Sequence, residues 1–149
     1  VIYTNFCNND LTVQLNAKPT LEDFSSSKFS LNIEDIKDLI SPTAINGVDA
    51  IGCKGGDYTP DEVLPTGNVL EHLQDLRKMY DYIFMEAAPM NNYTDTPELI
   101  DFVDGVIAIF SSRTVIKEID MEAIIYLKKL DGKFDGAILN KVELENLEK

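Results

Sequence analysis

The chain has 149 residues, 44% of them hydrophobic and 26% charged, which suits one domain of ordinary globular composition. Its formal net charge is −13, from 26 acidic and 13 basic residues. Such a surface repels phosphate backbones and anionic headgroups, which argues against nucleic-acid binding. No apolar run reaches the ~18 residues of a membrane span, and the N-terminus lacks a signal-peptide pattern. The cysteines, Cys7 and Cys53, are widely spaced, which indicates reduced cytosolic core thiols rather than a disulfide framework or a metal site.

The first half of the chain predicts two strands and a helix. Residues 1–6 (VIYTNF) form a short β-type run before the turn-rich CNND. The segment SLNIEDIKDLISP at 30–42 predicts a helix that Asn32 caps and Pro42 stops, with Ile33, Ile36, Leu39 and Ile40 on one face. Residues 48–53 (VDAIGC) predict the second strand.

The second half alternates helices with strands. Helices are expected at 68–79, 97–103 and 116–130, and strands at 81–86 (DYIFME), 105–110 (GVIAIF) and 136–140 (GAILN). The inward residues expected on these helices are Val69, Leu70, Leu73, Leu76 and Met79 on the first, and Ile119, Ala123, Ile124 and Leu127 on the last. The apolar strand 105–110 is expected to be buried on both sides. The acidic tail, 143–149, is expected to fray or to add a last helical turn.

Strands that alternate with helices predict an α/β fold, a doubly wound and mostly parallel sheet with helices on both faces. Ligands of such folds bind beyond the carboxyl ends of the strands. The segments to inspect are therefore 5–9, 53–57, 86–95, 111–114 and 140–142. Neither repeats nor interdomain linkers interrupt the chain.

Two of these segments contain candidate chemistry. Glu86 at a strand end could hold the water shell of Mg²⁺, and Asp95 in the next loop could orient a nucleophile. The alternative, a solvent-facing or capping acid, is favoured on geometry alone. CKGG at 53–56 could form an anion-binding nest with Lys54, or a turn that needs positive φ at glycine. The patterns G-x-x-x-x-G-K-S/T and G-x-G-x-x-G are absent from the sequence, and with His72 as the one histidine no catalytic triad is credible.

Several longer segments of the sequence, taken together, resemble those of a known protein family. The segments YDYIFMEAAP, TDTPELIDFVDGVIAIF and GAILNKVE, in that order, resemble the cytoplasmic P-loop domain of bacterial tyrosine kinases (BY-kinases) of capsule and exopolysaccharide export. The stretch from Gly55 to Leu76 also resembles the family's G-x-x-x-P-x-P-x-E-L-L segment. The resemblance covers residues 1–142 and implies a kinase-like P-loop NTPase fold of the SIMIBI type.

The resemblance assigns roles to individual residues. Glu86 stands at the Walker B aspartate, and Asn5 and Cys7 stand at the two aspartates of the D-x-D motif called Walker A′. Neither replacement supplies an anionic oxygen to Mg²⁺ or a base to a tyrosine hydroxyl. The family's DTPP reads EAAP here. Asp95 and Asn140 match family positions, and Asn140 lies near the adenine in related ATPases.

The family's P-loop lies upstream of the position matched by Val1, so we expect the chain to be a fragment of a longer protein. ATP and Mg²⁺ would bind only if an upstream P-loop exists; the fragment itself is expected to hold no cofactor. In the family the P-loop strand lies next to the Walker B strand. If the chain folds alone, strands 81–86 and 105–110 are expected to pair directly or to receive a strand from another chain.

The sequence favours a catalytically degenerate kinase-like domain of a capsule, exopolysaccharide or lipopolysaccharide biosynthesis or chain-length-control protein. It would act by contacts with protein partners or by self-association, on the cytoplasmic side of the inner membrane, within a membrane-anchored parent. One alternative is an active ATP-dependent protein-tyrosine kinase whose P-loop lies upstream. Another is a nucleotide-binding sensor module without hydrolysis.

Overall fold

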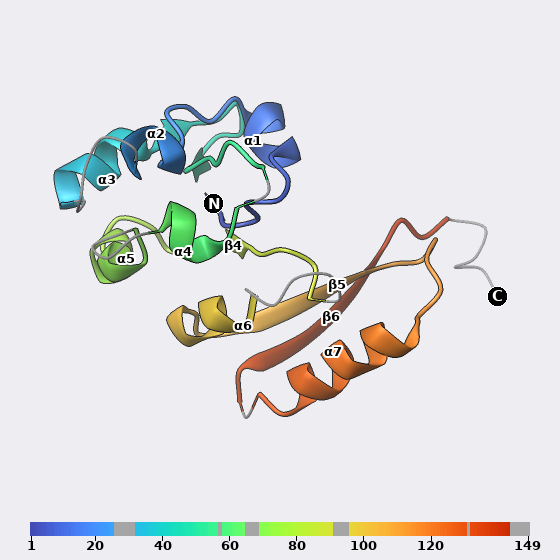
Figure 1. Ribbon diagram of the computed structural model, residues 1–149. Coiled ribbons are helices and arrows are strands. Elements are labelled where there is room, and N and C mark those ends of the chain that lie inside the picture. Colours follow the sequence, from blue (N-terminus) through green and yellow to red (C-terminus); the bar gives the residue numbers. More distant parts are fainter. Residues whose placement is uncertain (26–31, 57, 65–68, 91–95, 131, 144–149) are drawn as a thin grey trace. The chain divides into compact units, whose positions relative to one another are not determined.

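The computed structural model describes residues 1–25, 32–56, 58–64, 69–90, 96–130 and 132–143 (Figure 1). The chain divides into two compact units, Val1–Ala88 and Pro89–Lys149. Each unit combines helices with a pair of parallel strands. The fold is therefore mixed α/β with short parallel sheets, in agreement with the predicted class. A single sheet wound with helices on both faces stays a prediction.

The first unit is built around β1. Its elements are β1 (Ile2–Tyr3), α1 (Asp10–Leu15), α2 (Leu21–Ser25), α3 (Ile33–Leu39), β2 (Ser41–Pro42), β3 (Asp49–Ala50), α4 (Pro60–Val63), the 3₁₀ helix η1 (Val69–His72), α5 (Leu73–Leu76) and β4 (Met85–Glu86).

Strand β1 has neighbours on both edges. It pairs in parallel with β4, Ile2 opposite Met85 and Tyr3 opposite Glu86. On its other edge the Tyr3 amide donates to the Ile51 carbonyl (3.0 Å), in a parallel bridge between Ile2 and Ile51. The predicted strands 1–6, 48–53 and 81–86 are thus confirmed, each shorter than expected. Because β1 is the middle of the three, its residues are almost completely buried.

The connection between β2 and β3 differs from the expected parallel pattern. The two strands form an antiparallel hairpin, with Ser41 opposite Ala50 and Pro42 opposite Asp49. The Thr43 amide and hydroxyl both donate to the Val48 carbonyl, at 3.2 and 2.7 Å, and close the turn. A connection this short cannot make the crossover that a parallel pair requires, so the strands reverse direction.

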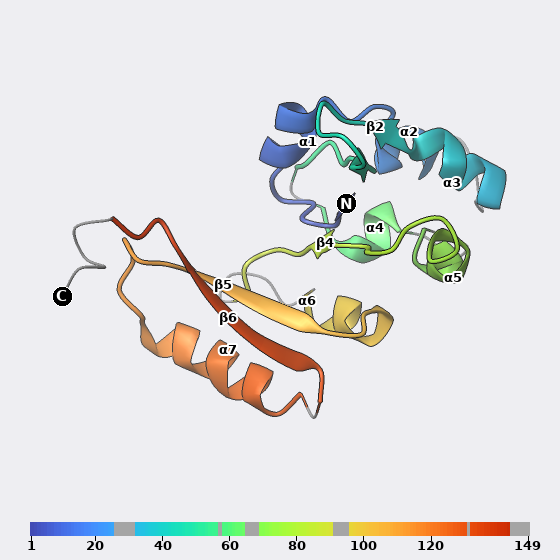
Figure 2. The same cartoon turned by 180° about the vertical axis from the view of Figure 1, so that it is seen from behind.

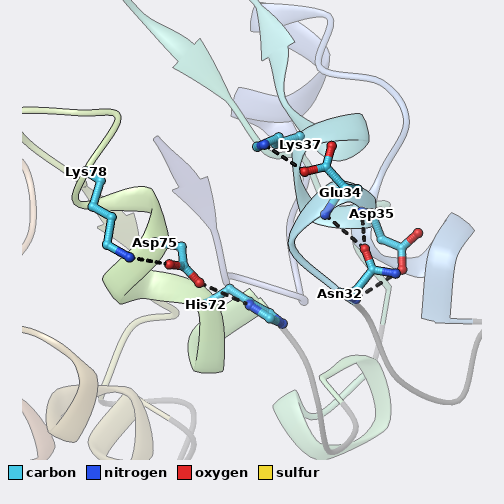
Figure 3. A network of polar contacts seen from close by, with 7 residues as sticks. All are labelled: Asn32, Glu34, Asp35, Lys37, His72, Asp75 and Lys78. Carbon is cyan, nitrogen blue, oxygen red and sulfur yellow. Dashed lines mark hydrogen bonds and ion pairs between the residues drawn. The ribbon is translucent and has the colours of Figure 1, made fainter.

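Helix α3 begins as the sequence predicts. The Asn32 side chain accepts hydrogen bonds from the amides of Glu34 (2.9 Å) and Asp35 (3.1 Å), and the Asp35 carboxylate accepts from the Asn32 amide (3.0 Å) (Figure 3). This reciprocal capping box satisfies amides that the first turn leaves unpaired. Of the four residues predicted on the inward face, Ile36 and Leu39 are fully buried, and Ile33 and Ile40 are partly exposed.

Replacing Asn32 by alanine should lower the free energy of unfolding by about 1 kcal/mol, because the N-cap acceptor is lost. Asn32→Asp keeps a side-chain oxygen in place and should stay within a few tenths of a kcal/mol of the wild type, roughly. Urea denaturation of the three proteins measures both differences. Equal losses in the two variants would show that the cap contributes nothing specific.

The predicted helix 68–79 is found as η1 followed directly by α5. Four of its expected inward residues are buried, but the fifth, Met79, is 48% exposed because it lies beyond the end of α5. Helices α1 and α2 were not predicted: both are short and rich in polar residues, and α1 stops at Asn16, whose backbone is left-handed (φ 51°). The largest completely buried side chains of the unit come from β1, α2, α3, η1 and the loops: Tyr3, Phe6, Leu21, Ile36, Leu39, Cys53 and Val69.

The second unit contains α6 (Thr96–Leu99), the 3₁₀ helix η2 (Ile100–Phe102), β5 (Val106–Ser111), α7 (Glu118–Lys128) and β6 (Phe134–Asn140). β5 and β6 are parallel, and the chain passes between them through α7, which runs alongside the pair (Figure 2). This βαβ arrangement confirms the predicted order of strand, helix and strand. The register runs from Val106 opposite Phe134 to Ser111 opposite Asn140, with an irregularity between Val106 and Ile107.

Two packing predictions for this unit are wrong. Ile107 and Ile109 of β5 are 50% and 69% exposed, so the elements of this unit do not bury the strand on both sides. Ile119, expected to face inward, is 48% exposed, whereas Leu127 of the same helix is buried. These side chains are exposed because the sheet is narrow: two strands offer α7 little surface to cover. None of the helices in the described parts of the chain has the length and apolar character that a membrane span needs.

Candidate functional site

The parallel pairing of β1 and β4 brings two sequence-predicted site residues to the same edge. Asn5 follows β1 by two residues, and Glu86 is the last residue of β4. Thr4 fixes the pairing at this end, because its amide and its hydroxyl both donate to the Glu86 carbonyl, at 2.9 and 2.7 Å. The site therefore lies at the carboxyl ends of two parallel strands, where α/β folds bind ligands.

Asn5 is a buried polar residue, 8% exposed. Its side chain lies near enough to the Glu86 carboxylate to lower the pKa of that group. Its Oδ1 atom is buried and has no hydrogen-bond partner among the residues that the structure describes. A buried acceptor without a donor costs about 1–3 kcal/mol, so this atom is an unusual feature of the site.

Glu86 is partly buried, and burial raises the pKa of its carboxyl group above the ordinary value. The Asn5 side chain opposes this rise, and the nearby negative charge of Asp10 adds to it. The carboxylate is thus held close to one neutral amide and to a second acid. This environment favours its neutral form more than water does.

The raised pKa of Glu86 predicts a pH-dependent stability difference. Relative to the unfolded chain, the site stabilises the fold most when Glu86 is protonated, and this contribution is lost as the pH rises from the unfolded pKa, near 4.5, through the folded pKa. Glu86→Gln, which resembles the protonated acid, should therefore be more stable than the wild type at pH 7. The two proteins should converge near pH 4. Denaturation curves from pH 4 to 7 check this; a difference that stays constant with pH would contradict it.

Cys7 lies in the turn that follows Asn5. The Asn8 amide donates to the Asn5 carbonyl (3.2 Å), and the thiol of Cys53 lies 3.5 Å from that same oxygen. Both cysteines are free thiols; Cys7 is partly exposed and Cys53 is buried. Burial, followed by the charge of Glu22, raises the pKa of Cys53 to about 11, so it is a protonated core thiol as the sequence predicts.

The CKGG loop forms a turn in which the protein supplies its own anions. Gly55 and Gly56 have positive φ (70° and 145°), which confirms the turn interpretation. The Lys54 amide donates to both carboxylate oxygens of Glu22 (2.8 and 2.9 Å), and Lys54 Nζ lies 2.5 Å from Asp23 Oδ1. Lys54, followed by Thr20, lowers the pKa of Asp23 to about 2. An adjoining open cleft of about 470 Å³ is lined by Lys54 and Asp23 but by neither Asn5 nor Glu86.

The remaining predicted site residues lie elsewhere. Asn140 ends β6 in the second unit and is exposed, and its side-chain oxygen accepts from the Lys141 amide (2.7 Å). Asp95 lies outside the described residues. Sequence reasoning missed Thr4 and Asp10, the residues that fix the Glu86 backbone and influence its charge. Only the register of β1 against β4 brings them near Glu86, and no local motif signals that register.

Two solved structures define the class by fold. The chain is similar to the BceF tyrosine kinase domain (TM-score 0.68, 20% identity, 93% of this chain and 54% of that one). It is also similar to the chimerical protein CapA2B2 (TM-score 0.74, 17% identity, 95% of this chain and 62% of that one). The fold is therefore that of a bacterial tyrosine kinase-like domain.

A comparison of sequences identifies a relative by name. The chain is 23% identical over 119 residues to the putative tyrosine-protein kinase CapB of Staphylococcus aureus, covering 80% of this chain. It spans about half of that relative's length, 52%. No protein-family model matches the chain. The resemblance to bacterial tyrosine kinases predicted from the motifs is confirmed.

Proposed function

We propose that this chain is a non-catalytic kinase-like domain that acts through protein contacts in capsule, exopolysaccharide or lipopolysaccharide biosynthesis or chain-length control. The observation that carries the proposal is the pair formed by Asn5 and Glu86 at the carboxyl ends of β1 and β4. This is the position where the family resemblance places the carboxylates that bind metal.

The residues of this pair fit a magnesium nucleotide poorly. Phosphoryl transfer depends almost entirely on positioning and on neutralising charge. Asn5 is neutral, Cys7 offers a thiol that Mg²⁺ does not favour, and Glu86 contributes a carboxylate whose burial opposes ionisation. At the positions where related kinases carry metal-binding carboxylates, this chain thus has two residues without a carboxylate and one whose burial opposes ionisation. Loss of catalysis is the simplest consequence.

One of the similar structures supports a protein partner. One similar structure is of a chimerical protein, CapA2B2, and a chimera joins parts of different proteins. We place the domain on the cytoplasmic side of the inner membrane, in a membrane-anchored parent, and its partners in a polysaccharide export assembly. Because the chain spans only about half of its curated relative, the activity of the whole protein belongs to the proposal as well.

Calorimetric titration of the full-length protein tests the proposal. ATP and ADP are titrated with Mg²⁺ and, as a control, with EDTA. We expect no Mg²⁺-dependent binding. Nucleotide binding that needs no metal and leads to no hydrolysis would favour the sensor module instead. Mg²⁺-dependent ATP binding that Glu86→Gln abolishes would overturn the proposal, because it would show a working metal site.

A further inference from the structure

The described residues at the ends of β1 and β4 place two hydrogen-bond acceptors near each other, Asn5 Oδ1 and the Glu86 carboxylate. Asn5 is more than nine-tenths buried, and its Oδ1 has no donor among the described residues. The neighbouring Glu86 carboxylate is near the neutral Asn5 amide and near the negative charge of Asp10. Acceptors held in this way indicate that a positively charged donor completes the site.

We propose that Asn5 and Glu86 together accept the guanidinium group of an arginine supplied by a partner protein. This inference rests on the proposed function and names the chemistry of the contact. The cation would neutralise Glu86 and give Asn5 Oδ1 a donor. The Asn5 amide rotates about a broad, two-fold torsion, so that its oxygen can turn toward the arriving group.

The shape of the acceptors favours guanidinium over other cations. Guanidinium presents several N–H donors in a planar fork and sheds its hydration more easily than an ammonium group, which suits a partly buried site. Mg²⁺ demands near-octahedral oxygen ligands and dehydrates reluctantly. The strongly negative chain, with a formal charge of −13, also attracts basic partners.

Three lysines of the same unit pair with acids of their own. Lys37 pairs with Glu34 (2.8 Å), Lys54 with Asp23 (2.5 Å) and Lys78 with Asp75 (2.7 Å). Two of these pairs, Glu34 with Lys37 and Asp75 with Lys78, join residues three positions apart in the sequence (Figure 3). These three lysines already have acidic partners, so the cation for Glu86 is taken to come from a partner protein.

The test uses ethylguanidinium as a probe of the arginine head group. The full-length protein is labelled with ¹⁵N at asparagine, and the side-chain signal of Asn5 is assigned by its loss in Asn5→Gln. Ethylguanidinium should shift this signal saturably. Ethylammonium, with the same charge, should bind at least about threefold more weakly, because it lacks the planar fork.

Two variants test whether ethylguanidinium binds at Glu86. Glu86→Gln should weaken ethylguanidinium binding by about tenfold or more, since a charge-assisted hydrogen bond is lost. Asp38→Asn removes one acid from an exposed position of α3 in the same unit and should leave binding unchanged. Because Glu86→Gln is expected to be at least as stable as the wild type at neutral pH, its loss of binding cannot be ascribed to unfolding.

The remaining outcomes overturn the inference in distinguishable ways. No saturable shift of Asn5, equal shifts with both cations, or an unchanged affinity in Glu86→Gln would each contradict the guanidinium site. If Mg²⁺-ATP is also without effect in the same titration, the proposed non-catalytic function survives. If Mg²⁺-ATP shifts Asn5 saturably, the proposed function fails together with the inference.

Discussion

Replacing Asn5 by aspartate is expected to destabilise the protein at pH 7 by about 3 kcal/mol, because a second carboxylate would be buried without a cation. Asn5 is 8% exposed and already contacts the Glu86 carboxylate, so the two acids would repel each other at close range. The loss should shrink below pH 5, where the new aspartate is protonated and resembles asparagine in charge. Urea denaturation across pH 4 to 7 measures this dependence.

The matched control for this variant is Asn46→Asp. Asn46 is exposed in the turn between β2 and β3, so the same change of charge should cost less than about 0.5 kcal/mol. Mg²⁺ at millimolar concentration should recover part of the stability of Asn5→Asp and should not stabilise the wild type. An Asn5→Asp protein as stable as the Asn46→Asp control would contradict the description of Asn5 as a buried, uncompensated position.

The second large effect is expected for Phe6→Ala, which should lower the free energy of unfolding by about 3–5 kcal/mol. Phe6 is 2% exposed and lies between the two site residues Asn5 and Cys7. Its ring therefore anchors the turn that carries them. The alanine leaves a cavity that the surrounding core fills only in part.

Phe84→Ala removes the same side chain from a position that is 60% exposed. It should cost about 1 kcal/mol or less, chiefly from the loss of stacking on Tyr82, whose ring centroid lies 6.5 Å away. Thermal or urea denaturation compares the two variants. Similar losses would mean that Phe6 is not the anchor of the turn.

Much of the fold follows from local patterns in the sequence. Asn32, the acids behind it and the spacing of Ile36 and Leu39 predict α3, because capping and periodicity act within one helix. The apolar run of β5 predicts a strand for a similar reason. The hairpin of β2 and β3 is different, since Ser41–Pro42 carries little strand propensity and pairs only because the turn at Thr43 brings Asp49–Ala50 back. Such pairing depends on tertiary context.

Some features of the candidate site can likewise be predicted from the sequence, whereas others depend on the tertiary structure. The family resemblance was enough to predict that Asn5, Cys7 and Glu86 belong to one edge of the sheet, and the pairing of β1 with β4 brings Asn5 and Glu86 together there. The buried oxygen of Asn5 and the raised pKa of Glu86 depend on burial, which a residue's neighbours in sequence do not determine. Lys54 illustrates the converse: its loop resembled an anion site, but Glu22 and Asp23 of the same chain occupy its donors.

The central claim is that the site at the ends of β1 and β4 no longer supports metal-dependent phosphoryl transfer. The most direct measurement is phosphotyrosine formation by the full-length protein, both after incubation with Mg²⁺-ATP and after isolation from its native cells, read by mass spectrometry. We predict that the wild type and Glu86→Gln both give only the background signal, with no phosphotyrosine formed. Phosphotyrosine that forms on the wild type with Mg²⁺ and disappears in Glu86→Gln would contradict the claim.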